Sequence, residues 1–264
     1  MRFRPCIDIH NGTVKQIVGG SLTDQGDQAE ENFAATQGAE YFARLYQKDQ
    51  LTGGHVIMLN SKTSPYYEQT KAQALRALQT YPGGLQIGGG ITEQNAMEFL
   101  AAGASHVIVT SYAFSDGEIQ WEHMKKLRDA VGKEHVVLDL SCRKKDGVYY
   151  IVTDRWQTFT NVQLSTELLE ELAEYCDEFL VHGVDVEGHA AGIDAELAKL
   201  LGSYEGNPVT YAGGIGSMEN LEEFAEISEG NLDFTIGSAL DLFGGNMQYD
   251  VVKNFGCAER NRGE

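Results

Sequence analysis

The sequence has little of what marks secreted, membrane-spanning or nucleic-acid-binding proteins. Among its 264 residues there are only 4 prolines and 4 cysteines. No uninterrupted apolar run approaches the ~18 residues that a membrane helix needs. Basic residues are also scarce, since Lys and Arg number 20 against 39 Asp and Glu, and the formal net charge is −19. A surface this acidic repels nucleic-acid phosphates and anionic lipids, so we expect a soluble protein that binds neither nucleic acid nor membrane.

The four cysteines form no pattern that would bind a metal ion or build a disulfide framework. They are far apart, and no histidines cluster near them at zinc-finger spacing. Cys6 and Cys142 stand in apolar segments, as buried reduced thiols do. Because the first hydrophobic run begins by Phe3, we expect no leader peptide and a cytoplasmic protein in a reducing compartment. The plastid stroma is the alternative if the protein comes from a plant and a transit peptide has been removed.

Short apolar runs recur along the whole chain, with amphipathic segments between most of them. Continuous apolar runs are typical of strands buried on both faces of a parallel sheet. Eight strand–helix alternations in a chain of 264 residues predict an α/β fold, a single (β/α)8 TIM barrel domain over residues 1–264. A doubly wound open sheet is the alternative. The expected strands are Phe3–Ile9, His55–Leu59, Leu85–Ile87, His106–Val109, His135–Leu140, Phe179–Val181, Val209–Ala212 and Phe234–Ile236.

Hydroxyl residues ahead of the amphipathic segments predict where three of the helices begin. Thr92, Thr166 and Ser217 could each accept a hydrogen bond from a backbone N–H of the first helical turn. The residues expected to face the core are Leu168, Leu172 and Cys176 after Thr166, and Leu221, Phe224 and Ile227 after Ser217.

An internal repeat divides the chain into two similar halves. Residues 85–114 and 209–240 share a Gly-Gly-Ile turn, at an offset of 124 residues between Gly89 and Gly213, and a serine turn, at an offset of 127 between Ser111 and Ser238. The segment CIDI, which contains Asp8, resembles VLDL in the second half. Two half-barrels of approximately residues 1–125 and 126–264 explain this spacing.

The repeated elements predict two phosphate sites. Glycine lets the backbone approach an oxyanion closely, and free N–H groups at the start of a helix favour negative charge. In a barrel these turns follow strands three, four, seven and eight, so the two sites would lie opposite each other at the active face. The chain has no Walker loop and no G-x-G-x-x-G, so nucleotide phosphates are not indicated. The expected ligand is a small molecule with a phosphate at each end, held by Gly89, Gly90, Thr110 and Ser111 on one side and Gly213, Gly214, Gly237 and Ser238 on the other.

Two aspartates at the ends of apolar strands are the candidates for acid–base chemistry between the phosphates. Burying a carboxylate among apolar neighbours is costly, and Asp8 and Asp139 each end such a strand. Facing each other across a barrel, they could serve as a general acid and a general base. Asp185 and Glu187 follow strand six as lower-ranked participants. Histidines 10 and 182 could orient the ligand, and the tryptophan of TDRWQT could stack over it.

Eight motifs are distinctive in combination: PCIDIHNGTVKQIVGG, LQIGGGIT, VIVTSYAF, VVLDLSCRKKDG, RWQT, HGVDVEG, TYAGGI and TIGSALDLFGG. Together they resemble the HisA-type isomerases of histidine biosynthesis, in the version found in plants and fungi, over nearly the whole chain. The resemblance implies a barrel enzyme that converts N′-(5′-phosphoribosylformimino)-5-aminoimidazole-4-carboxamide ribonucleotide (ProFAR) into its ribulosyl isomer (PRFAR). This is an Amadori rearrangement, in which an aldose amine becomes a ketose amine, and it implies no metal and no redox cofactor.

The resemblance also implies roles for single residues. Asp8 matches the strand-one aspartate that accepts a proton, and Trp156 matches the tryptophan of the loop after strand five. The glycine and hydroxyl turns match the family's two phosphate sites. The substrate-binding residues that we expect are His10, Gly20, Gly89, Gly90, Thr110, Ser111, Ser141, Arg143, Trp156, His182, Glu187, Gly213, Gly214, Gly237 and Ser238.

The chain departs from the bacterial pattern on strand five. The bacterial Leu-Asp-Ala-Arg, aligned on Arg143, places its aspartate on Ser141, whereas this chain carries Asp139 two residues earlier. Residues two apart on a strand face the same side, and the repeat pairs Asp139 with Asp8. We therefore assign the general acid to Asp139, with Asp185 in reserve.

Two further departures concern substrate contacts. On strand six, the bacterial Thr-Asp and following Asp-Gly become His182-Gly183 and Glu187-Gly188. The arginine after the bacterial GGGI is Thr92 here, which removes one cation beside a phosphate.

Two other functions compete with this hypothesis. The cyclase subunit of imidazole glycerol phosphate synthase shares the repeat and both phosphate sites, but it would need a lysine at His10 and a Thr-Ser-Met-Asp-Arg-Asp-Gly run on strand six, which this chain lacks. A non-catalytic phosphosugar-binding barrel would keep the glycines and lose Asp8 and Asp139.

We expect the protein to be a monomer.

Overall fold

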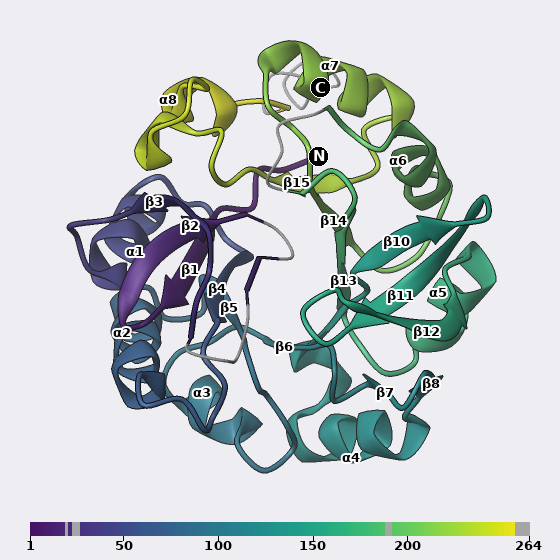
Figure 1. The fold of residues 1–264 in the computed structure, drawn as a ribbon, viewed down its shortest axis with the longest axis horizontal. Coiled ribbons are helices and arrows are strands. Elements are labelled where there is room, and N and C mark those ends of the chain that lie inside the picture. The colour runs from purple at the N-terminus through teal and green to yellow at the C-terminus, as the bar shows by residue number, and fades with distance from the viewer. Residues whose placement is uncertain (19–20, 23–26, 188–191, 257–264) are drawn as a thin grey trace, which may run out of the picture.

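A ring of parallel strands forms the centre of the molecule (Figure 1). The computed structural model describes residues 1–18, 21–22, 27–187 and 192–256. Each strand of the ring pairs in parallel with the next one in chain order. The eight strands are β1 (Cys6–His10), β4 (Gly54–Met58), β5 (Leu85–Gly88), β6 (Val107–Val109), β9 (Val136–Asp139), β13 (Glu178–His182), β14 (Val209–Ala212) and β15 (Asp233–Thr235). Each of the eight predicted strands therefore overlaps one strand of the ring, with ends that differ by a few residues.

The residues just ahead of β1 close the ring onto β15. Phe3 forms a parallel bridge with Phe234. The backbone N–H of Arg4 donates to the Phe234 carbonyl at 2.8 Å, and the Phe234 N–H donates to the Arg2 carbonyl at 3.0 Å. This pairing supplies the contact between the last and the first strand that an open sheet lacks. The fold is the predicted (β/α)8 barrel, and the doubly wound alternative is wrong.

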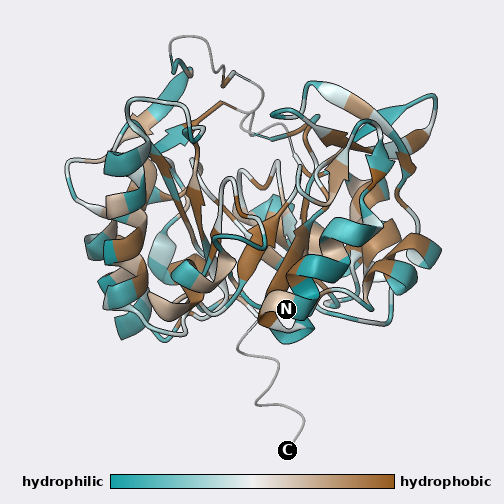
Figure 2. Cartoon of the chain, turned by 90° about the horizontal axis from the view of Figure 1, so that it is seen from below, coloured by the Kyte–Doolittle hydropathy of each residue, from teal (hydrophilic) through white to brown (hydrophobic). Residues whose placement is uncertain are grey.

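Helices surround the ring and turn their apolar sides toward it (Figures 1 and 2). In α1, for example, Phe42 and Tyr46 are fully buried against the strands. The helices are α1 (Ala39–Lys48), α2 (Tyr67–Thr80), α3 (Ala96–Ala101), α4 (Trp121–Val131), α5 (Thr166–Leu172), α6 (Ala195–Gly202), α7 (Met218–Ile227) and α8 (Tyr249–Val252). Within the described part of the chain, none of them combines the length and apolar character needed to span a bilayer.

One of the three predicted helix caps is confirmed. Ser217 caps α7, because its hydroxyl accepts from the Asn220 N–H at 3.2 Å. The cap of α5 is Ser165, one residue before the predicted Thr166, and the helix ends at Leu172, so Cys176 lies beyond it. Ser165 is the capping residue because its backbone is extended, as a capping residue requires, while Thr166 is already helical.

The prediction that Thr92 caps a helix is wrong. Helix α3 begins only at Ala96, after Asn95, which does not cap it with its side chain. Instead the Asn95 side-chain oxygen accepts from the Thr92 N–H at 2.8 Å, and the Asn95 amide donates to the Gly90 carbonyl at 3.2 Å. These bonds close a turn directly after the glycines, which delays the start of the helix.

Additional antiparallel strands stand on the end of the barrel opposite the N-terminus (Figure 2). On one side, β2 (Thr13–Ile17) and β3 (Glu31–Ala34) extend from β1. On the other side, β10 (Cys142–Lys145), β11 (Val148–Thr153) and β12 (Thr158–Gln163) form a three-stranded sheet directly after β9. The small pair β7 (Phe114–Ser115) and β8 (Glu118–Ile119) follows β6. The two larger additions flank the opening of the barrel (Figure 1).

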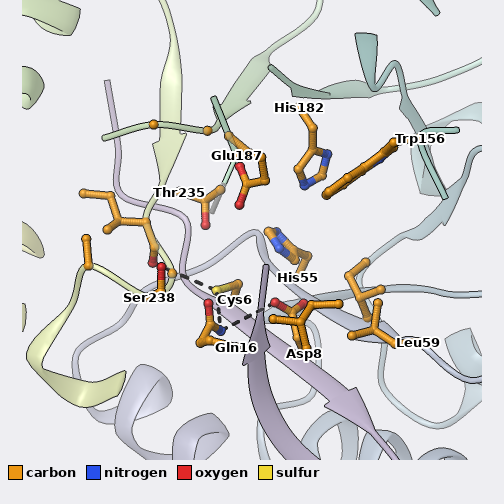
Figure 3. Close-up of a pocket in the computed structure, with 18 of the residues that line it drawn as sticks. Cys6, Asp8, Gln16, His55, Leu59, Trp156, His182, Glu187, Thr235 and Ser238 are labelled. Carbon is orange, nitrogen blue, oxygen red and sulfur yellow. Dashed lines mark hydrogen bonds between the residues drawn. The ribbon is translucent and has the colours of Figure 1, made fainter. Parts of the chain in front are cut away.

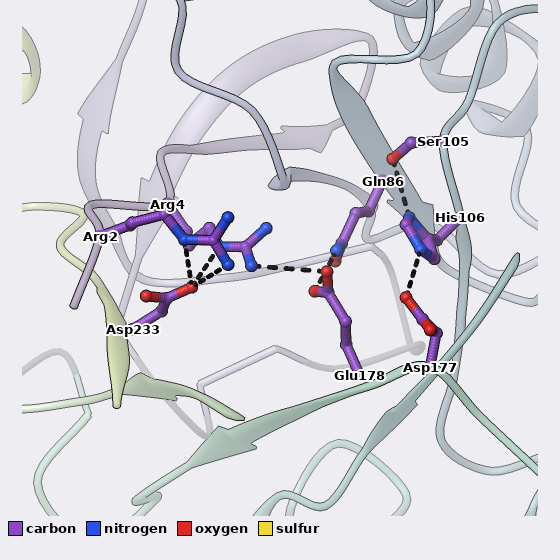
Figure 4. A network of polar contacts seen from close by, with 8 residues as sticks. All are labelled: Arg2, Arg4, Gln86, Ser105, His106, Asp177, Glu178 and Asp233. Atoms are coloured by element: carbon purple, nitrogen blue, oxygen red, sulfur yellow. Dashed lines mark hydrogen bonds and ion pairs between the residues drawn. The ribbon is translucent and has the colours of Figure 1, made fainter. Parts of the chain in front are cut away.

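The opposite end of the barrel is closed by buried charged groups (Figure 4). The Arg4 guanidinium, whose side chain is 3% exposed, contacts Asp233 at 2.8 Å and Glu178 at 3.4 Å. Glu178 also accepts from the Gln86 amide at 2.7 Å. Buried charges are tolerated when they are paired and hydrogen-bonded. This network therefore lets three strands and the segment ahead of β1 meet at the floor of the ring.

Candidate active site

The carboxyl ends of the eight strands surround two adjoining cavities of about 220 and 720 Å³. Both contain Asp139, Arg155 and Trp156 in their walls, so they form one continuous hollow across the top of the barrel. Active sites of such barrels lie at this end, because the loops after the strands converge there. Figure 3 shows the smaller cavity, with side chains that point into it from strands on several sides of the ring.

Most of the predicted site residues line this hollow. The larger cavity is bordered by the first glycine turn and the first hydroxyl turn, and the smaller cavity by the second pair. Strands β5 and β6 lie four places from β14 and β15 in the ring, so the two sets face each other. The predicted residues in the walls are Asp8, Gly89, Gly90, Thr110, Ser111, Asp139, Trp156, His182, Glu187, Gly213, Gly214, Gly237 and Ser238.

Other predicted residues are not in the walls of either cavity. His10 is buried, 1% exposed, and Ser141 is buried behind Asp139. Arg143 and Asp185 form a half-exposed ion pair with 2.8 Å between Nε and Oδ1. The reserve acid Asp185 is therefore engaged by a cation outside the hollow. Gly20 lies outside the described residues.

The glycines of the two turns adopt conformations that other residues rarely take. The backbone φ is +102° at Gly89, +68° at Gly90, +128° at Gly213 and +72° at Gly214. A Cβ on Gly89 would lie 2.1 Å from the Met58 carbonyl oxygen. Left-handed geometry and close backbone approach both require glycine here, and they expose backbone groups to the hollow.

Asp139 has the surroundings of an ionised carboxylate. Its Oδ1 accepts from the Ser141 N–H at 3.0 Å, the Ser141 hydroxyl at 2.7 Å and the His182 Nδ1 at 3.3 Å. Its Oδ2 accepts from the Thr110 hydroxyl at 3.1 Å. Burial opposes ionisation, but the His182 charge and these hydrogen bonds outweigh it and lower the pKa of Asp139. A carboxyl group with a lowered pKa does not fit the predicted role of a proton donor.

Asp8, its counterpart in the sequence repeat, has the opposite character. It lies partly buried in the wall of the cavity, and its Oδ2 accepts from the Gln16 amide at 3.5 Å. Burial raises the pKa of Asp8 to about 7; the nearby His182 acts against this shift and Glu187 adds to it. A carboxyl group that titrates near neutral pH suits the predicted role as a base that gives its proton back.

Two histidines beside the aspartates carry different charges. Burial works against a charge on His182, but Asp139, Glu187 and Asp8 outweigh it and raise the pKa of His182 to about 9. Burial and the charge of His182 lower the pKa of His55 to about 3, so His55 is neutral. Their rings lie 6.4 Å apart, centroid to centroid, and both face the cavity (Figure 3). One imidazolium, paired with Asp139, therefore lines the same cavity as Asp8.

The turn between β11 and β12 projects over the hollow. Three consecutive residues in this turn, Asp154, Arg155 and Trp156, have φ values of +50°, +58° and +70°. Left-handed residues other than glycine are uncommon and tend to collect at functional sites. The turn places the Trp156 ring 5.5 Å from the His182 ring and puts Arg155 in the wall of both cavities.

Three residues in the cavity walls were not predicted from the sequence, namely Lys62, Arg155 and Gln16. Lys62 follows β4 and lines the larger cavity beside Gly90. It therefore brings a cation to the glycine turn, where the bacterial arginine is replaced by Thr92. Lys62 could have been predicted as a site residue, because it stands three residues after an expected strand and therefore on the active face of a barrel. Gln16 could not be found in this way, because it stands on the unpredicted β2.

Comparison with known proteins agrees with this geometry. Residues 2–247 match the family described as Histidine biosynthesis protein. The chain belongs to this family. A chloroplastic 1-(5-phosphoribosyl)-5-((5-phosphoribosylamino)methylideneamino)imidazole-4-carboxamide isomerase of Medicago truncatula is 54% identical, over 96% of this chain and 81% of the relative. Isomerases with the same substrate name are 46% identical in Yarrowia lipolytica (98% of this chain, 97% of the relative) and 42% identical in Saccharomyces cerevisiae (93% and 94%).

Proposed function

We propose that this histidine biosynthesis protein is the isomerase that converts ProFAR into PRFAR. The observation that carries the proposal is the continuous hollow with a glycine turn on each side and Asp8 between them. A molecule with a phosphate at each end fits this arrangement, because each turn offers backbone groups to an oxyanion. The names of the Medicago and yeast relatives describe a substrate with two phosphoribosyl groups, which agrees with this pattern.

The chemistry needs a proton donor and a proton acceptor on either side of one ribose. A proton delivered to the ring oxygen opens the ring as a C=N bond forms at C1′. Removal of the C2′ proton then gives an enolamine, which becomes the ketose amine when C1′ is protonated. Asp8 is the base for the C2′ proton in this proposal, since its pKa of about 7 lets it accept and return a proton near neutral pH. Neither step calls for a metal or a redox cofactor.

The direct test follows the ultraviolet shift from ProFAR to PRFAR with purified protein, in the absence of ammonia and glutamine. We expect conversion under these conditions. The cyclase alternative predicts no change in ProFAR and consumption of PRFAR only when ammonia is added. A phosphosugar-binding barrel would bind ProFAR without converting it.

For its setting in the cell, we propose a monomeric single-domain barrel in the cytoplasm, or in the plastid stroma if the source is a plant. The name of the Medicago relative includes the word chloroplastic, which supports the second location. Sedimentation analysis checks the monomer, and a fluorescent fusion of the full-length protein checks the compartment.

A further inference from the structure

His182 stands where a proton donor for the ring oxygen would have to stand. We propose that protonated His182 is the acid that opens the ribose ring, and that Asp139 is the positioning residue that holds it. The proposal deepens the proposed function, because it names the donor for the first step of that reaction. It replaces the expectation that Asp139 itself gives the proton.

The geometry leaves one nitrogen of His182 for the substrate. Nδ1 is engaged by Asp139 Oδ1 at 3.3 Å and lies 3.4 Å from the Ser141 hydroxyl. Nε2 is therefore the nitrogen available to a ligand in the cavity, whose wall includes the ring. Trp156 lies against the ring (Figure 3), with 5.5 Å between the centroids. An imidazole fixed by a carboxylate on one nitrogen and presented to a substrate by the other is a common arrangement for general acids.

The acidic groups around the ring all favour its protonated form. Asp139 on β9, Asp8 on β1 and Glu187 after β13 all raise the pKa of His182, against the effect of burial. His55 on β4 is itself uncharged above a pH of about 3, and Arg155 lines the same cavity from the hairpin turn. With a pKa of about 9, His182 carries a proton at neutral pH.

The strand register explains why the two aspartates differ. Asp8 pairs with Ile57 of β4, and Asp139 pairs with Leu180 of β13. Two residues further along the chain from these partners stand Leu59, directly after the end of β4, and His182, the last residue of β13. Asp8 therefore meets an apolar neighbour where Asp139 meets an imidazole. One half of the repeat keeps a carboxyl group of raised pKa, and the other half holds an ion pair.

The proton transfers of the isomerisation balance with these two groups. His182 gives its Nε2 proton to the ring oxygen, the C1′–O bond breaks, and the nitrogen lone pair forms the C=N bond. Asp8 takes the proton from C2′, and the electron pair of that C–H bond forms the C1′=C2′ double bond of the enolamine. Asp8 then protonates C1′, while neutral His182 takes the proton of the C2′ hydroxyl as the ketone forms. Both residues return to their starting states.

The pH dependence of kcat/KM for ProFAR tests the proposal, because it reports the pKa values of groups in the free enzyme. We expect activity to rise as Asp8 ionises near pH 7 and to fall as His182 loses its proton near pH 9. His182→Gln should lower kcat/KM by about 10²–10⁴-fold at pH 8 and remove the alkaline limb. Asp139→Asn should move the alkaline limb to lower pH, because the anion that favours protonated His182 is gone.

The control is His106→Gln, which removes another histidine paired with an aspartate. His106 contacts Asp177 at 3.3 Å at the opposite end of the barrel, so its variant should keep the wild-type profile. If His182→Gln retains the alkaline limb, the acid is another group and the proposal is wrong. The same conclusion follows if His182→Gln keeps wild-type kcat/KM at pH 8.

A measurement without substrate separates this proposal from the proposed function. In an NMR experiment, the imidazole signal of His182 is identified as the one that is missing from the spectrum of His182→Gln. In the wild-type enzyme this signal should titrate near pH 9. Titration at or below the ordinary histidine value of about 6.5 would refute the ion pair even if the enzyme converts ProFAR. Titration near 9 in a protein that does not convert ProFAR would instead refute the function and leave the pair standing.

Discussion

Adding one methyl group to each glycine turn should have unequal effects, because the two turns are packed differently. Gly90 and Gly214 have nearly the same backbone φ, +68° and +72°. A Cβ on Gly90 would meet only the Lys62 side chain, with Cε at 3.6 Å, whereas a Cβ on Gly214 would lie 2.0 Å from the Gly192 carbonyl oxygen and 3.1 Å from Val186 Cβ. The Gly214→Ala variant must therefore displace backbone.

The expected magnitudes follow from these contacts. A left-handed alanine costs about 1–2 kcal/mol, and the less flexible unfolded chain offsets about 0.4–1 kcal/mol of it. Gly90→Ala should therefore lower the unfolding free energy by about 1 kcal/mol, which corresponds to roughly 2–4 °C in Tm for a chain of this size. For Gly214→Ala, overpacking adds about 1–3 kcal/mol, so its Tm should fall about two to four times as far.

Thermal unfolding followed by circular dichroism measures both losses, and KM for ProFAR is measured on the same samples. Gly230→Ala is the matched control, since Gly230 has φ +72° with nothing within 4 Å of its Cβ position. It should match Gly90→Ala in Tm and leave KM unchanged. We expect KM to rise strongly for Gly214→Ala, because its turn must move. Equal Tm values for Gly214→Ala and Gly230→Ala would refute the packing argument, and an unchanged KM would refute a phosphate site at this turn.

Three other changes test the remaining parts of the site. Asp8→Asn should lower kcat by about 10²–10⁴-fold with little change in KM, since the phosphates provide most of the ground-state binding; wild-type kcat in steady-state assays would exclude Asp8 as the base. Lys62→Ala should raise KM and weaken its dependence on ionic strength, because screening acts on the cation that is removed; a KM that depends on salt as in the wild type would place Lys62 outside the phosphate site. Exhaustive chelation should leave kcat unchanged, and loss of activity that a divalent ion restores would show that a metal is required.

The ring of strands and the glycine turns could be predicted because their signals are local. Strands buried on both faces need continuous apolar runs, and a duplicated Gly-Gly-Ile at matched spacing is visible without a structure. Thr92 shows the limit of local reasoning, because a side-chain bond from Asn95 closes a turn where a helix start was expected. The local sequence does not show whether Thr92 caps a helix with its side chain or donates its N–H to the Asn95 side chain.

The pairing of side chains across strands could not be predicted. Asp8 and Asp139 look alike in sequence, and both stand in an apolar strand. Their different pKa values depend on which side chains of the neighbouring strands and loops lie beside each of them, and that depends on register. The strand that carries Gln16, and the two strands joined by the turn that carries Trp156, were not predicted for a related reason. Their polar and apolar residues alternate over short lengths, which is a weak signal inside a chain dominated by buried strands.

The register positions of Leu59 and His182 also bear on how such an enzyme could arise. If the two half-barrels descend from one duplicated ancestor, their aspartates began with the same neighbour and the same acidity. A change at the position beside the carboxylate, together with the hydroxyl groups of Thr110 and Ser141, would then give the copies different chemical roles, with both carboxylates and both phosphate turns retained at every step. Divergence of this kind does not require any ancestral protein that had lost the ability to bind its phosphorylated ligand. The different roles of the two aspartates would thus result from a change in the residues around them, while the aspartates and the glycine turns themselves stayed the same.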